Sequence, residues 1–298
     1  IEMVKALALV DTDAISKCNF TVAVDGINSV GGEIIPMLLR SLGVNNIIEI
    51  NCESTGNFAH TPEPIPQNLT EISDVMRKTG ADVGFVVDPD VDRLAIVMEN
   101  GEMFVEENTL VAIADYVLSH TPGSTVSNLS SSRGLRDVTR SHGCEYSAAA
   151  VGEVNVVTKM KEVCAIIGGE GNGGIIYPEL HYGRDALVGV ALFLTLMAKS
   201  GKKVSEIKAG LPHYEIAKNK IELTPDIDVD KILEAVKLHF ADEEVNDIDG
   251  VKIDFADSWV HLRKSNTEPI IRIYSEAATM AEADKLADSI KQIIISLK

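Results

Sequence analysis

No apolar run in this sequence reaches the ~18 residues of a membrane-spanning helix, and no secretory signal is visible. Positive charge is also scarce, because 27 lysines and arginines face 45 acidic residues and leave a net charge of −18. Nucleic acids and anionic membranes need a basic face, so neither is expected as a partner. A small phosphorylated ligand stays compatible, since it needs only a local cluster of donors or a metal ion.

Cysteines are few and widely scattered, at Cys18, Cys52, Cys144 and Cys164, and none forms a Cys-x-x-Cys pair. This spacing predicts reduced, structural thiols and a cytoplasmic location. Aromatic residues make up only 5% of a chain that is 45% hydrophobic, so we expect aliphatic cores. The chain begins on Ile1 instead of a methionine, which predicts that a further part of the protein lies upstream.

The 298 residues suggest two or three domains at about 100–150 residues each. Aliphatic runs alternate with helical patterns, as in the strand–turn–helix pattern of residues 20–43 and the strand at 46–50, which indicates α/β architecture. Residues 108–120 read as a helix with Asn108 as N-cap, and residues 185–198 as an apolar, sandwiched helix. We predict two similar βαβ-layered domains, 1–120 and 121–210, followed by a small α+β domain, 211–298.

An acidic loop, "DPDVDR", follows the apolar segment that ends at Val87. In an extended chain, side chains at every second position share a face, so Asp88, Asp90 and Asp92 should converge. Their repulsion would cost several kcal/mol or raise their pKa values unless a cation lies between them. A hard divalent ion resolves the conflict, and Mg²⁺ suits a loop that leaves positions open for water and phosphate.

Two other interpretations of the acidic loop compete with this one. The three aspartates and Glu99 match positions 1, 3, 5 and 12 of an EF-hand, but Arg93 stands where that loop needs glycine. The residues after Arg93 also alternate as in a strand, whereas an EF-hand continues as a helix. A plain solvated acidic turn is the other possibility.

A glycine-rich stretch, "GGEGNGG", contains a literal G-x-G-x-x-G. A dinucleotide fingerprint must open a helix, but the segment "IIYPEL" that follows does not favour one. We instead expect a flexible, backbone-exposed loop that presents Glu170 and Asn172. A carboxylate and an amide suit sugar hydroxyls, which need both acceptors and donors. An ordinary glycine-rich connection is the alternative.

A third polar loop, "RKSNTEP", lies between two predicted strands. Arg263 offers a bidentate fork, Ser265 and Thr267 offer hydroxyls, and Asn266 offers an amide. With the backbone N–H groups of a turn, these groups could form an anion nest. The pattern indicates phosphate binding, and a polar hairpin turn is an equal alternative for the loop taken alone.

These three loops, together with "DGINSVGG" (25–32) and "HTPEPIPQNL" (60–69), occur in an order that resembles the α-D-phosphohexomutase family. That family comprises phosphoglucomutases, phosphomannomutases and phosphoglucosamine mutases, and its members have four domains around a central cleft. The resemblance places this chain on the second, third and fourth domains. It implies Mg²⁺ ligands at Asp88, Asp90 and Asp92, and a catalytic Arg93 that supports the phosphoryl group. It also implies a sugar-binding glycine loop and an arginine loop that holds the phosphate not being transferred.

The sequence departs from the family pattern in several places. The phosphoserine motif of the first domain is absent, so a missing N-terminal domain is the expected partner. Val91 replaces the usual glycine of the metal loop, which we expect to be a small change, and Asn172 replaces a serine. Two positions that hold lysine and histidine in some members read Ser130 and Glu153, which leaves Arg133 and His181 as candidate substrate-binding substitutes.

The resemblance therefore implies a Mg²⁺-dependent enzyme that moves a phosphoryl group between O1 and O6 of a phosphorylated hexose. This chain alone should be inactive, because the serine that carries the phosphoryl group is not in it. A phosphosugar-binding module without catalysis is the alternative, and a Ca²⁺-stabilised structural protein is a third possibility. The identity of the hexose stays open.

Overall fold

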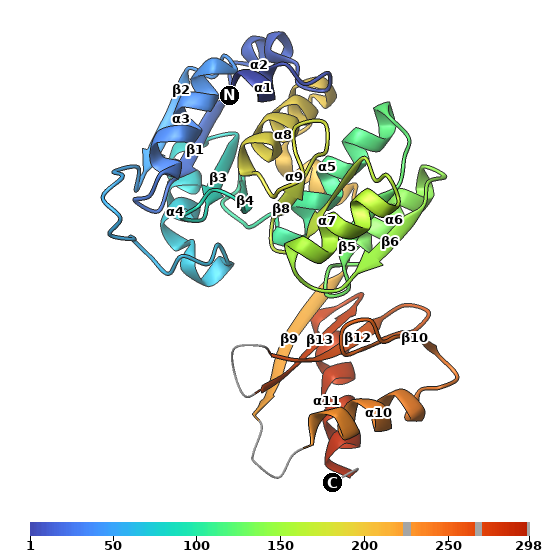
Figure 1. Cartoon of the computed structure of the whole chain (residues 1–298). Coiled ribbons are helices and arrows are strands. Elements are labelled where there is room, and N and C mark those ends of the chain that lie inside the picture. The colour runs from blue at the N-terminus through green and yellow to red at the C-terminus, as the bar shows by residue number, and fades with distance from the viewer. Residues whose placement is uncertain (223–227, 266–269, 297–298) are drawn as a thin grey trace. The chain divides into compact units, whose positions relative to one another are not determined.

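The structure is a computed structural model that describes residues 1–222, 228–265 and 270–296 (Figure 1). The chain forms two compact units, one comprising Ile1–Ala148 and Gly152–Pro212, the other comprising Ala149–Val151 and His213–Lys298. In the described ranges, no helix is long and apolar enough to cross a membrane. All four cysteines are free, which agrees with the predicted reduced thiols.

The first sheet of the larger unit has the order β2-β1-β3-β4. Strands β1 (Thr21–Asp25), β2 (Asn46–Ile50) and β3 (Val83–Val87) are parallel, and β4 (Leu94–Met98) runs antiparallel to β3. The connecting helices are α3 (Gly31–Ser41) and α4 (Thr70–Thr79). Every residue of β3 and β4 is buried, although β4 lies at the edge of the sheet, so both faces of these two strands are covered.

The second sheet repeats this arrangement with the order β6-β5-β7-β8. Its strands are β5 (Thr125–Asn128), β6 (Tyr146–Ala149), β7 (Ile167–Glu170) and β8 (Gly174–Ile176), and its helices are α6 (Gly134–Ser141) and α7 (Glu153–Glu162). As in the first sheet, the fourth strand is antiparallel to the third. The predicted repeat of βαβ layers is confirmed at the level of topology.

One buried helix, α8 (Ala186–Ser200), belongs to the core that both sheets share. Its Phe193 ring meets the ring of Phe85 from β3 at 6.4 Å and that of Phe104 at 5.4 Å, both edge-to-face. Asp185 caps the helix by accepting hydrogen bonds from the backbone N–H groups of Leu187 and Val188. The expectation of an apolar, sandwiched helix is therefore confirmed. Besides α5, which is described next, the unit also contains α1 (Glu2–Lys5), α2 (Thr12–Cys18), α9 (Val204–Ala209) and a 3₁₀ turn at Pro66–Asn68.

Helix α5 (Glu106–His120) begins earlier than predicted. Its N-cap is Val105, with φ of 75°, so the expectation of an N-cap at Asn108 is wrong. The Asn108 amide instead donates a hydrogen bond of 2.8 Å to the carbonyl of Phe104, within the first turn. An asparagine side chain can bond local backbone on either side of a helix start, so the residue type alone could not place the boundary.

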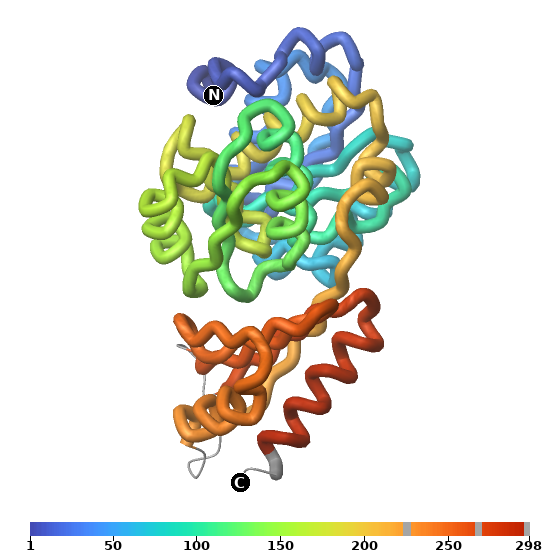
Figure 2. Tube along the Cα trace, turned by 90° about the vertical axis from the view of Figure 1, so that its right-hand side faces the viewer, coloured from blue at the N-terminus to red at the C-terminus, as the bar shows by residue number. Residues whose placement is uncertain are grey.

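The second unit contains a five-stranded antiparallel sheet with the order β10-β11-β12-β13-β9. Its strands are β9 (Glu215–Glu222), β10 (Glu244–Asn246), β11 (Val251–Asp254), β12 (Trp259–Lys264) and β13 (Ile270–Ala277). Helices α10 (Val229–His239) and α11 (Met280–Ser296) pack against one face through aliphatic side chains. Figure 2 shows α11 as one continuous helix beside this sheet. The predicted fold class, α/β with two similar βαβ-layered domains followed by a small α+β domain, is confirmed.

Candidate functional site

The acidic loop lies at the carboxyl end of β3, and its three aspartates converge. The ligand oxygens of Asp88, Asp90 and Asp92 all lie within 4.8 Å of one another. The chain there is a turn, not an extended segment, because Val91 adopts a φ of 61° and its N–H donates to the carbonyl of Asp88 at 3.1 Å. The convergence that we predicted is therefore present, but a tight turn produces it.

Val91 carries a conformational cost that the sequence did not reveal. A β-branched residue in the left-handed region is strained by roughly 1–2 kcal/mol, so the expectation that valine for glycine is a small change is wrong for the backbone. The Val91 side chain is buried, and a Cβ on Gly31 would lie 3.5 Å from its Cγ2 and 2.3 Å from Cγ2 of Val87. Gly31, from the 25–32 motif, thus makes room for the β3 end and its loop.

Asp88 stabilises the backbone of the acidic loop through hydrogen bonds, and its carboxylate also lies near those of Asp90 and Asp92. Its Oδ1 accepts hydrogen bonds of 3.1 Å from the N–H groups of Asp92 and Arg93, and its Oδ2 accepts one of 2.5 Å from Nε of Arg93. Asp88 is 1% exposed, so this network is protected from water. Arg93 is consequently held in place within the acidic loop by Asp88, and its support of a phosphoryl group stays a prediction.

Asp92 shows the electrostatic tension that a cation would relieve. Burial, with a further contribution from the neighbouring Asp88 carboxylate, raises the pKa of Asp92 to about 6 although the Arg184 guanidinium opposes the shift. Its Oδ1 is buried and has no hydrogen-bond partner among the described residues. Nε of Arg93 lies 3.8 Å from this oxygen. Three converging carboxylates with a buried oxygen that accepts no hydrogen bond from the described part of the chain fit a hard divalent cation such as Mg²⁺.

Arg184 joins the acidic loop to the glycine-rich loop, and our sequence reasoning did not identify it. Its guanidinium donates to Asp92 Oδ2 and, at 2.8 Å, to Glu170 Oε2, while its backbone N–H donates to Glu153 Oε1 at 2.9 Å. Glu153 occupies a position where some members of the family have histidine or lysine, and here it supports the arginine. The available signal was a lone arginine just before the N-cap aspartate of α8.

The glycine-rich stretch includes the end of β7, the turn and the start of β8, which together form a buried β-hairpin. Glu170 is 5% exposed, and its Oε1 accepts hydrogen bonds from the Asn128 amide at 2.8 Å and the Gly152 N–H at 3.1 Å. Asn172 closes the turn by accepting a 3.2 Å bond from the Gly174 N–H. A strand follows instead of a helix, so the structural context of a dinucleotide fingerprint is absent.

The expectation of a backbone-exposed glycine loop is wrong, because the glycines allow close approach to neighbouring chain segments. The carbonyl of Gly173 accepts a 3.0 Å bond from the Leu94 N–H, and a Cβ on Gly173 would lie 2.3 Å from the carbonyl oxygen of Leu94. The acidic loop, which ends just before Leu94, and the glycine hairpin are therefore joined by a backbone hydrogen bond.

Gly171→Ala tests this packing, because the added Cβ would lie 1.9 Å from a carboxylate oxygen of Glu107. We expect a loss of about 1–3 kcal/mol in unfolding free energy, as for overpacking in a core. Gly210→Ala is the matched control, since its nearest contact is an ordinary 3.4 Å. Urea unfolding followed by circular dichroism measures both; equal stability of the two variants would contradict the packed hairpin.

Arg133 and His181, the two predicted substrate-binding substitutes, have different surroundings. Arg133 is 4% exposed and stands at the N-cap of α6, and the preceding Ser131 hydroxyl accepts a 2.9 Å bond from the Gly171 N–H. His181 is half exposed, and its Nε2 lies 2.9 Å from Asp185. Their roles toward a substrate stay predictions.

Two further motifs from the sequence meet at a buried carboxylate next to the acidic loop. Asp25, at the end of β1, is 1% exposed and lies 3.3 Å from Nε2 of His60. This hydrogen bond raises the pKa of His60 although partial burial opposes it. The Ser29 hydroxyl donates to the carbonyl of Pro89 at 2.8 Å. The 25–32 motif thus supports the backbone of the acidic loop through Ser29, and Asp25 of the same motif holds His60 of the 60–69 motif.

In the second unit, the predicted phosphate loop is only partly described. Arg263 and Ser265 are described, whereas Asn266 and Thr267 lie outside the described residues. Nε of Arg263 is buried and has no hydrogen-bond partner in the described part of the chain. Arg272 on β13 is its direct cross-strand neighbour, so two guanidinium groups share one face of the sheet. Arg272 was also missed by the sequence reasoning, because only the strand register brings it beside Arg263.

Comparison with known proteins agrees with this arrangement. Models of the phosphoglucomutase/phosphomannomutase family match in sequence order: alpha/beta/alpha domain II at residues 1–101, alpha/beta/alpha domain III at 106–214, and the C-terminal domain at 220–293. The chain is 37% identical over 279 residues to a phosphoglucomutase/phosphomannomutase of Thermococcus kodakarensis, covering 92% of this chain and 60% of the relative. It is 30% identical to a probable phosphoglucosamine mutase of Methanopyrus kandleri, covering 96% of this chain and 64% of the relative.

A solved structure of a phosphoglucomutase/phosphomannomutase family protein from Burkholderia thailandensis superposes with a TM-score of 0.81 at 26% identity. The match covers 96% of this chain and 63% of that one, so the chain spans less than two thirds of the proteins that it resembles. The family models together match most of the chain, and their order is that of the loops described above. The chain belongs to the phosphoglucomutase/phosphomannomutase family.

Proposed function

We propose that this chain supplies the metal, sugar and phosphate loops of a Mg²⁺-dependent phosphohexomutase, which moves a phosphoryl group between O1 and O6 of a hexose. The observation that carries the proposal is the direct link, through Arg184, between the converging aspartates and Glu170. A metal loop and a hydroxyl-binding loop in one network suit a substrate that has both a phosphate and a sugar ring. Relatives are named for glucose, mannose and glucosamine phosphates, and the proposal covers these three hexose phosphates.

In this proposal Asp88, Asp90 and Asp92 would hold the Mg²⁺, which when bound would neutralise charge on the transferred phosphoryl group. Arg93, fixed by Asp88, orients a positive charge toward the same place. Asp90 is the exposed member of the three, so the open side of the loop faces solvent and can admit a phosphate.

Sugar hydroxyls would be bound by Glu170 and Asn172, with Arg133 and His181 as further candidates. Arg184 fixes one oxygen of Glu170, and the Asn128 amide and a backbone N–H fix the other. A carboxylate held in this way is preorganised as an acceptor for hydroxyl groups.

The idle phosphate would be bound in the second unit by Arg263 and Ser265, with Asn266 and Thr267 in the adjoining segment. The buried, unpartnered Nε of Arg263 supports this assignment. An anion beside Arg263 would also offset its repulsion with the neighbouring Arg272 guanidinium. We include Arg272 in the proposed phosphate site.

The phosphoserine of the reaction would come from a segment that is not in this sequence. Val30 is 56% exposed and Phe58 is 46% exposed, and their loops are joined by hydrogen bonds next to the metal loop. An N-terminal domain of the same protein would cover these apolar side chains. The alternative proposal, a binding module without catalysis, uses the same three loops.

We expect this chain alone to bind a hexose phosphate weakly and to show no mutase turnover in a coupled assay. Arg263→Ala should weaken glucose 6-phosphate binding about tenfold, because a charge-assisted, bidentate contact is lost. Lys264→Ala is the matched control, since its exposed side chain points to the opposite face of β12. Calorimetric titration distinguishes them; equal effects of the two variants would count against the phosphate site.

The pH dependence of Mg²⁺ binding should follow Asp92. Its pKa of about 6 means that the carboxyl is protonated at pH 5, and a proton then competes with the metal. Without metal, the raised pKa favours the folded state at low pH, and this contribution is lost as the pH rises through about 6. Mg²⁺ should therefore raise the melting temperature clearly at pH 7.5 and hardly at pH 5. A gain that does not depend on pH would exclude Asp92 as a ligand.

A further inference from the structure

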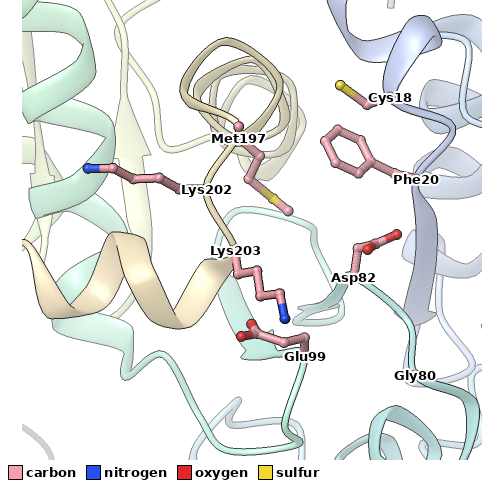
Figure 3. Close-up of a pocket in the computed structure, with 9 residues that line it drawn as sticks. Cys18, Phe20, Gly80, Asp82, Glu99, Met197, Lys202 and Lys203 are labelled. Atoms are coloured by element: carbon pink, nitrogen blue, oxygen red, sulfur yellow. The ribbon is translucent and has the colours of Figure 1, made fainter.

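A pocket of about 490 Å³ lies in the larger unit at the amino-terminal edge of the first sheet (Figure 3). Its lining includes Phe20 just before β1, Asp82 just before β3 and Glu99 just after β4. The metal loop begins at the opposite end of β3, roughly 17 Å away at 3.3 Å per strand residue. The pocket is therefore separate from the site described above.

The apolar part of the pocket comes from two elements. Met197, from the last turns of α8, is 2% exposed, and Phe20 is half-buried. Figure 3 shows the Met197 thioether and the Phe20 ring facing the same space. The half-buried Phe20 ring supplies most of the accessible apolar surface of this pair, with the buried Met197 thioether behind it, and such a ring suits an apolar side chain. The volume lies within the usual range for small-molecule sites, about 300–1,000 Å³.

The polar part of the pocket has one open acceptor and one open donor. Asp82 Oδ2 accepts a 2.8 Å hydrogen bond from the Thr21 N–H, while its Oδ1 has no donor in the described part of the chain. Both oxygens of Glu99 are used, since they accept bonds from the N–H and hydroxyl of Ser205. Lys203 is exposed, and its ammonium faces Glu99 in Figure 3. Although partial burial opposes the shift, the hydrogen bonds from Ser205 and the charge of Lys203 lower the pKa of Glu99. The ammonium keeps donors for a ligand, because both oxygens of Glu99 already accept from Ser205.

The Asp82 carboxylate and the Lys203 ammonium indicate that a ligand of this pocket would have both a positive and a negative group. The free oxygen of Asp82 would accept from an ammonium group, and Lys203 would donate to a carboxylate. The two side chains come from different walls, with the Phe20 and Met197 surface beside them. We propose that this pocket binds a small zwitterion with an apolar side chain, namely a free α-amino acid such as phenylalanine. The proposal does not depend on the mutase function.

The first test uses the unchanged protein and three probes, titrated by calorimetry and followed by saturation-transfer NMR. L-Phenylalanine should bind, whereas 3-phenylpropanoate, which lacks the ammonium, and 2-phenylethylamine, which lacks the carboxylate, should each bind at least threefold more weakly. Equal binding of either comparator would overturn the zwitterion assignment. No detectable phenylalanine binding at 20 mM, roughly the weakest affinity that such a small interface supports, would overturn the site itself.

The second test uses a double variant and a matched control. Asp82→Asn with Lys203→Gln should weaken phenylalanine binding at least tenfold. The amide oxygen introduced by Asp82→Asn would still accept the Thr21 N–H, so the fold should persist. Lys202→Gln removes the same charge as Lys203→Gln from the neighbouring residue, which also lines the pocket but whose ammonium points away from it in Figure 3, and should change binding less than twofold. Circular dichroism checks that both variants are folded. Equal affinities for the double variant and the control would contradict the proposal.

Discussion

Asp90→Asn should weaken Mg²⁺ binding by about tenfold or more, because affinity in such loops follows the number of charged ligands. Asp90 is exposed, so a neutral amide of nearly the same shape should leave the packing unchanged. Without metal, the variant should be as stable as the unchanged chain or slightly more so, since one of three repelling carboxylates becomes neutral. This combination, lost metal affinity with retained stability, is specific to a ligand role.

The measurement is a Mg²⁺ titration by calorimetry, repeated for Asp92→Asn and for a control, Asp74→Asn. Asp74 is an exposed carboxylate on α4 that pairs with Arg77 outside the loop. Asp92→Asn should lose metal affinity like Asp90→Asn, and Asp74→Asn should keep it. If Asp74→Asn weakened binding as much as Asp90→Asn did, Mg²⁺ would be held by general surface charge and not by this loop.

Arg184→Ala is expected to produce the largest loss of stability among the site variants, about 2–3 kcal/mol. The change leaves Asp92 and Glu170 without their shared guanidinium, and Glu170 is only 5% exposed. The stability of Arg184→Lys should lie between that of the unchanged chain and that of Arg184→Ala. A single ammonium cannot bind two carboxylates in the way that the forked guanidinium does. Loss of hexose phosphate binding should accompany both changes, since the metal and sugar loops are no longer joined.

Urea unfolding at pH 8, where Asp92 is ionised, measures this effect. The control is Arg40→Ala, which removes an exposed ion pair with Glu49 and should cost less than about 1 kcal/mol. A result for Arg184→Ala within the range of Arg40→Ala would show that the bridge between the two loops contributes little. The proposed joint metal and sugar site would then lose its main structural support.

Much of the fold follows from local patterns in the sequence. The strand at residues 46–50 was located at both ends, because an apolar run between glycine and asparagine signals leaves little freedom. The apolar α8 helix was also identified, since its length and capping aspartate are both local features. The start of α5 was missed because Val105, a residue that rarely occupies a left-handed N-cap, is held there by its tertiary surroundings.

The site was only partly predictable for the same reason. The three aspartates stand close together in the sequence, so their convergence could be predicted without the fold. Arg184 lies 92 residues from Asp92 and 14 from Glu170, and only the packing of α8 against both sheets brings them together. Arg272 could not be predicted from the sequence either, since its place beside Arg263 depends on the register of β12 and β13. The glycine hairpin was placed on the surface because its neighbours, Glu107 and Leu94, are remote in sequence.

The most direct test of the central claim is a calorimetric titration of this chain with glucose 1-phosphate and glucose 6-phosphate, with and without Mg²⁺, and with glucose as the control. Both phosphates should bind, because a mutase must accept its substrate in two orientations, and Mg²⁺ should tighten binding of each. Glucose should not bind measurably. Binding of glucose as tight as that of its phosphates, or hexose phosphate binding that is unchanged by Mg²⁺ and by Asp90→Asn, would contradict the account.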